Sequence, residues 1–239
     1  MNDIKPIKFL SCFLLFFIFG IMFTFYNYLL IPLIIEELEI SPFIVTQTVF
    51  TVLLNVPIFL TTLILVKSEG NELSWENIKV RLNFRKPVLN DFLWMLGSLI
   101  VAIVITVLII LLLSVLPISF DLLDLEKISP IIIKPLKGFE RLFVLFMPIS
   151  FFFNYVGEEI LWRGYIYPRQ ELIYGKKTWI ISGLLHGVYH FFMGVSVLVF
   201  LPILLAIPFV YSKTKNIYIV IIMHALLGAP TDFLLAIGI

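Results

Sequence analysis

The sequence predicts an all-α protein, a polytopic bundle of about seven transmembrane helices with a cytoplasmic N-terminus. Three observations lead to this fold class. Hydrophobic residues make up 61% of the 239 residues and charged residues only 14%, against roughly 25% charged in typical soluble domains. The mean hydropathy is +1.07. Long uncharged runs recur along the chain, and a soluble protein of this size could not bury so much apolar surface.

The same composition excludes several classes of protein. A single cysteine, Cys12, cannot support a disulfide scaffold. The chain is too apolar to be disordered. With 17 basic and 16 acidic residues the net charge is +1, which argues against a nucleic-acid partner bound through bulk electrostatics. The predicted environment is therefore a lipid bilayer.

The first three spans are uncharged runs long enough to cross about 30 Å of hydrocarbon at about 1.5 Å per residue. They are 9–35, 43–66 and 92–120. The first is much longer than the apolar core of a signal peptide, so we interpret it as a retained span.

The second half of the chain supplies four further spans. Residues 142–167 form the fourth, and the last runs over 216–239. Between them, 178–212 contains no Asp, Glu, Lys or Arg. A single helix there would be roughly 52 Å long, too long for one crossing. We therefore predict two helices that break near Gly194.

The distribution of positive charge predicts the orientation. In a seven-span model with the N-terminus inside, most basic residues fall on one side of the membrane, which the positive-inside rule makes cytoplasmic. They lie in 5–8, 67–86, 169–177 and 213–215. Residues 74–86 alternate polar and apolar side chains and predict a short interfacial helix.

The fourth predicted span carries Glu158, Glu159 and Arg163 in its second half. A charge at bilayer depth costs about 2.5 to 3.5 kcal/mol, so such residues are functional candidates. Glu159 and Arg163 are spaced i, i+4, with the acid first, which favours an ion pair. Glu158 points about 100° away and is left without a cation. The alternative is that the span ends near Gly157 and both acids lie at its edge.

The three histidines lie in the predicted spans that follow. His186 and His190 are spaced i, i+4 on one helix, on a face shared with Gly183, and His224 lies on the last span. Small residues mark close helix contacts, so this face should look into the bundle. Counted from the predicted cytoplasmic edges, Glu158, His190 and His224 lie at similar depth, so we predict a shared polar site.

These residues fall into three motifs within 140–235. They are Glu158-Glu159-Ile-Leu-Trp-Arg163-Gly, the segment HGVYH that ends at His190, and His224-Ala-Leu. The set resembles the CPBP family of intramembrane proteases, the CAAX-processing and bacteriocin-processing group. The motifs of that family are EExxxR, an aromatic residue four before a histidine, and HxxxN.

The resemblance implies an intramembrane endopeptidase. Glu158 and His190 would hold and activate the attacking water, His224 would stabilise the oxyanion, and Glu159 and Arg163 would orient the helix. The chain would be one transmembrane domain, 1–239, with accessory spans in 1–138 and catalytic spans in 139–239. Its substrate would be a membrane-associated or lipidated protein cleaved near its C-terminus. A short chain without a targeting signal favours a prokaryotic plasma membrane.

Two positions depart from the family pattern. His186 replaces the aromatic residue, and Gly228 replaces the asparagine of the third motif. Losing the asparagine removes a donor to the oxyanion. The candidates to replace it are Asn154, one helical turn before Glu158, and Thr231 or Asp232, about two turns after His224.

The departures leave alternatives open. Glu158 and the histidines at 186, 190 and 224 could form a zinc site, because i, i+4 histidines are a frequent ligand spacing. A catalytically silent immunity or scaffold protein is favoured by the missing asparagine. A proton-coupled transporter would use the same ionisable residues as a relay, although the sequence has no evident inverted repeat.

Overall fold

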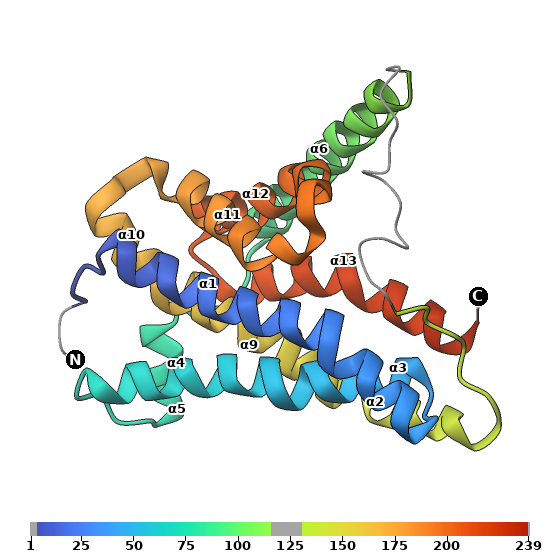
Figure 1. The fold of residues 1–239 in the computed structure, drawn as a ribbon. Coiled ribbons are helices and arrows are strands. Elements are labelled where there is room, and N and C mark those ends of the chain that lie inside the picture. The colour runs from blue at the N-terminus through green and yellow to red at the C-terminus, as the bar shows by residue number, and fades with distance from the viewer. Residues whose placement is uncertain (1–3, 116–130, 239) are drawn as a thin grey trace.

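The structure, a computed structural model, describes residues 4–115 and 131–238. Every regular element in these ranges is helical (Figure 1). The α-helices are α1 (Phe9–Phe25), α2 (Ile31–Leu38), α3 (Pro42–Val49), α4 (Val56–Ser68), α5 (Trp75–Arg81), α6 (Leu89–Val115), α8 (Met147–Phe151), α9 (Gly157–Glu159), α10 (Tyr167–Tyr174), α11 (Thr178–Tyr189), α12 (Val197–Thr214) and α13 (Ile217–Ile237). The predicted all-helical fold class is confirmed.

Within the described residues, five helices are long and apolar enough to cross a membrane, or six if the bent pair Gly138–Leu145 and Met147–Tyr189 forms one span. The five are Phe9–Leu38, Pro42–Ser68, Leu89–Val115, Phe191–Thr214 and Ile217–Ile237. The prediction of about seven spans is roughly consistent with this arrangement. It treated α11 as a separate span, but α11 has 12 residues and is only about 18 Å long.

The predicted break near Gly194 is present. His190 ends α11, a short 3₁₀ segment follows, and α12 begins at Val197. Gly194 has φ +57° and ψ −135°, a conformation that a residue with a Cβ atom rarely adopts. The break lets the chain reverse, so that α11 and α12 pack against each other over a close contact at Gly183, where a Cβ atom would lie 2.6 Å from Leu205 Cδ2.

The carboxylate of Glu69 joins three segments at the end of the bundle where α4 stops. Glu69 accepts hydrogen bonds from Arg169 Nε at 3.0 Å and from Tyr165 Oη at 2.8 Å, and it pairs with Arg81 of α5. Burial by itself would raise the pKa of Glu69, but the hydrogen bonds from Arg169, Arg81 and Tyr165 lower it to about 2. Glu69 is therefore ionised at neutral pH.

Further contacts bring the remaining basic segments to this same end. Arg85 Nη2 lies 2.8 Å from Asp91 Oδ1, and Lys215 Nζ lies 2.6 Å from Glu171 Oε2. Residues 67–86, 169–177 and 213–215 thus share one end of the bundle, as the charge pattern predicted. We call it the basic end. The start of α1 and the end of α13 lie at opposite ends of the molecule (Figure 1), which fits an odd number of crossings.

A topology reporter tests the orientation of the protein in the membrane, which is predicted only from the distribution of basic residues. If the basic end is cytoplasmic, a reporter fused after Ile239 should give an external signal, and one inserted at Lys176 should give a cytoplasmic signal. The insertion at Lys176 is the control, because it lies at the basic end. A cytoplasmic signal at both positions would contradict the odd number of crossings.

Candidate active site

Two widened helical segments frame the paired glutamates. The π-helical turns Phe152–Val156 and Ile160–Ile166 lie on either side of α9. Such segments insert an extra residue into a helix and are frequent at functional sites. Glu158 is 4% exposed and Glu159 is 0% exposed. Both acids therefore lie inside the bundle.

Glu159 connects the first and last motifs. Its Oε1 accepts a hydrogen bond from Arg163 Nη1 at 3.0 Å, which confirms the predicted i, i+4 ion pair. The same oxygen lies 2.9 Å from His224 Nδ1 on α13, at an ion-pair distance. The side chains of Glu159 and Arg163 are both fully buried. Glu159 thus fixes His224 as well as Arg163, a second role that its spacing in the sequence did not reveal.

Glu158 faces a different set of side chains. Its Oε1 accepts a hydrogen bond from Tyr189 Oη at 3.0 Å, while its Oε2 lies 3.8 Å from His186 Nε2. Among the described residues, Oε2 has no hydrogen-bond partner. One oxygen of Glu158 is therefore held by a phenol, and the other remains free to accept a proton.

His186 lies beside the free oxygen of Glu158 and connects it to the other two histidines. His186 Nε2 and His190 Nε2 are 3.1 Å apart, and their rings stack with centroids 4.9 Å apart. The ring of His224 lies 6.4 Å from that of His186. His186 Nε2 is therefore close to both Glu158 and His190. The sequence had offered His186 only as a replaced aromatic residue or as a metal ligand.

The space beside Gly228 is filled from another helix. The three atoms nearest to the place where a Cβ of Gly228 would lie all belong to Tyr155, with its Oη at 2.6 Å. Neither Asn154 nor Asp232, two of the replacements suggested by the sequence, is among them.

Two tyrosines of this site were therefore missed by the sequence analysis. Tyr155 lies three residues before Glu158, and Tyr189 directly precedes His190. Their proximity to the motifs was a usable signal. Aromatic residues are so frequent in this chain, with 24 Phe and 9 Tyr, that this proximity did not set them apart.

The side chains do not form a ready metal site. Within the described ranges, no group of three or more His, Cys, Asp or Glu side chains is placed to hold a metal ion. His224 is directed to Glu159, and the Nε2 atoms of His186 and His190 face each other. A zinc ion would need a rearrangement of these side chains.

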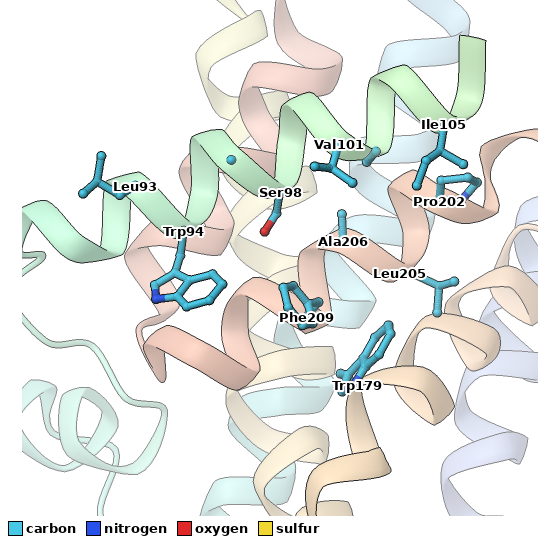
Figure 2. Close-up of a pocket in the computed structure, with 12 residues that line it drawn as sticks. Leu93, Trp94, Ser98, Val101, Ile105, Trp179, Pro202, Leu205, Ala206 and Phe209 are labelled. Atoms are coloured by element: carbon cyan, nitrogen blue, oxygen red, sulfur yellow. The ribbon is translucent and has the colours of Figure 1, made fainter. Parts of the chain in front are cut away.

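A separate apolar cavity of about 630 Å³ lies between α6, α11 and α12. Figure 2 shows Trp94 and Ser98 of α6 on one side and Ala206 and Phe209 of α12 on the other, with Trp179 of α11 nearby. None of the histidines and neither glutamate of the candidate site lines this cavity. It is therefore distinct from the candidate active site.

Comparison with known families bears directly on these motifs. Residues 140–229 match the family model described as "Type II CAAX prenyl endopeptidase Rce1-like". The match covers the segment that carries the three motifs and supports its similarity to the CPBP/CAAX family of intramembrane proteases. The match and the long apolar helices together support an integral membrane protein. No curated protein and no solved structure matches the chain.

The buried Glu159–Arg163 pair should be important for folding stability. Glu159→Gln or Arg163→Ala would leave a buried charge unpaired, so we expect a loss of about 3 to 5 kcal/mol, measured as a lower melting temperature and a lower yield of folded protein.

The matched control is Glu171→Gln, which breaks the ion pair with Lys215, whose side chains are 35% and 41% exposed. An exposed pair contributes about 0 to 1 kcal/mol. Equal melting temperatures for the Glu159 and Glu171 variants would contradict the structural role of the buried pair.

Proposed function

We propose that the protein is an intramembrane endopeptidase in which Glu158 is the general base. The observation that carries this proposal is the environment of Glu158, where Tyr189 holds one carboxylate oxygen and the other has no partner within the described residues. That free oxygen lies 3.8 Å from Nε2 of His186, which in turn lies 3.1 Å from Nε2 of His190. The family match supports proteolysis and does not favour a silent scaffold or a transporter.

Glu158 and His190 would hold the attacking water. In the first step, the water oxygen bonds to the carbonyl carbon of the scissile peptide, and the water proton passes to Oε2 of Glu158. The carbonyl π electrons move to the carbonyl oxygen, which becomes an oxyanion. In the second step, the carbonyl re-forms, the C–N bond breaks, and the leaving nitrogen takes the proton from Glu158. A positioned carboxylate can perform both transfers.

His224 would donate to the oxyanion. Its side chain is 17% exposed and is held through Nδ1 by fully buried Glu159. A donor fixed in this way needs little reorganisation when charge develops on the carbonyl oxygen, which is the condition for electrostatic stabilisation of a transition state. Glu159 and Arg163 would position His224 without contacting substrate.

The substrate would be a membrane-associated protein, cleaved near its C-terminus. The candidate site lies inside a bundle of apolar helices, and two of its acids are almost fully buried. A peptide bond must be brought to that site from the membrane or its interface. A segment anchored in the bilayer, by a helix or by a lipid, is therefore the substrate we expect.

Cleavage of membrane-anchored peptides by the purified protein tests this function. Glu158→Gln keeps the size of the side chain but removes its basicity, so we expect turnover to fall by about 10² to 10⁴-fold with an unchanged melting temperature. His190→Ala should be similarly inactive. Equal turnover by the wild type and Glu158→Gln would rule out this mechanism.

The role of His186 can be separated from metal binding. In the metal-free mechanism, His186→Phe removes one hydrogen bond to His190, worth about 0.5 to 1.5 kcal/mol, so we expect a loss of activity of about 2- to 10-fold. Dialysis against a chelator should have no effect. Stoichiometric metal that disappears in His186→Phe together with all activity would instead support the zinc site predicted as an alternative.

A further inference from the structure

Tyr155 carries a buried hydroxyl that has no role in the mechanism proposed above for Glu158, His190 and His224. The side chain is 3% exposed, and its Oη has no hydrogen-bond partner among the described residues. Buried phenols usually find a partner, because an unpaired polar group in an apolar interior costs free energy. The O–H of Tyr155 is therefore a donor with no partner inside the described part of the protein.

The hydroxyl lies beside the proposed oxyanion donor. The ring of Tyr155 meets the ring of His224 edge to face, with centroids 5.1 Å apart and planes at 73°. Its Oη also fills the space next to Gly228, one helical turn after His224, where a Cβ atom would approach to 2.6 Å. Any side chain at position 228 would push the hydroxyl away from this place.

Tyr155 also belongs to the same helical stretch as the general base. It lies in the π-helical turn that precedes α9, three residues before Glu158. The other tyrosine near Glu158, Tyr189, already donates its hydroxyl hydrogen to Oε1 of Glu158. Tyr155 is thus the phenol whose hydrogen is still available, and it reaches the site on the side of His224.

We propose that Tyr155 is a catalytic residue that donates its O–H to the oxyanion together with His224. This assignment rests on the proposed function. A donor without a partner in the free protein breaks no hydrogen bond when the tetrahedral intermediate forms, so its full strength is available when negative charge develops on the carbonyl oxygen. Gly228 makes the arrangement possible because it leaves room for the phenol.

Tyr155→Phe tests the assignment, because it removes only the hydroxyl. We expect kcat to fall by about 10² to 10³-fold, as for other single oxyanion donors, while KM and the melting temperature stay close to those of the wild type. The matched control is Tyr167→Phe, a buried phenol that packs on Tyr211 at the basic end and should retain full activity.

A double-mutant cycle with Gly228 distinguishes donation from packing. Gly228→Ala should displace the hydroxyl and lower kcat in the wild type, but it should cost at most a further 3-fold when Tyr155 is already Phe. Such non-additivity is expected when both changes remove one interaction. Additive losses, or a kcat within 3-fold of the wild type for Tyr155→Phe, would overturn the assignment.

Glu158→Gln, assayed in parallel, separates this inference from the proposed function. If Glu158→Gln is inactive and Tyr155→Phe is fully active, only the role of Tyr155 fails. If Glu158→Gln is as active as the wild type, the peptidase mechanism fails, and the role of Tyr155 fails with it.

Discussion

The buried carboxylate of Glu159 is the contact on which the rest of the site depends. A charge inside a membrane protein must be paired, because its desolvation is costly. Glu159 contacts Arg163 in its own helical stretch and His224 on α13 through the same oxygen. This contact joins the helical stretch that carries the glutamates to the last helix. It also sets the rotation of α13, and with it the direction in which Gly228 faces.

The two adjacent glutamates differ because of their surroundings, not their chemistry. Glu159 contacts Arg163 and His224, so its role is structural. Glu158 is directed toward Tyr189 and His186, with its Oε1 bonded to Tyr189 Oη and its Oε2 3.8 Å from His186 Nε2. A rotation of about 100° between neighbouring helical residues is enough to produce this division. The same stretch of helix thereby carries both the support of the site and its proposed base.

Contacts at the basic end fix the same helical stretch, from Tyr155 to Arg169, at its far end. Glu69, ionised at neutral pH because of its hydrogen bonds from Arg169, Arg81 and Tyr165, ties the end of α4 to α5 and α10. The residues from Tyr155 to Arg169 are thus anchored at one end by Glu69 and in the middle by Glu159. Two charged anchors on one continuous stretch restrict how far Glu158 can move, and a general base needs such a fixed position.

The sequence alone determined the all-helical membrane class, the break at Gly194, the Glu159–Arg163 pair and the common end of the basic segments. All of these follow from composition or from local spacing, because the fixed period of a helix relates spacing in the sequence to position in space. The tertiary structure alone decided that His224 meets Glu159, that His186 Nε2 lies close to both Glu158 and His190, and that Tyr155 fills the space beside Gly228. These contacts depend on how separate helices are rotated and how closely they approach each other. Packing over the whole bundle sets both, so a local sequence pattern cannot predict them.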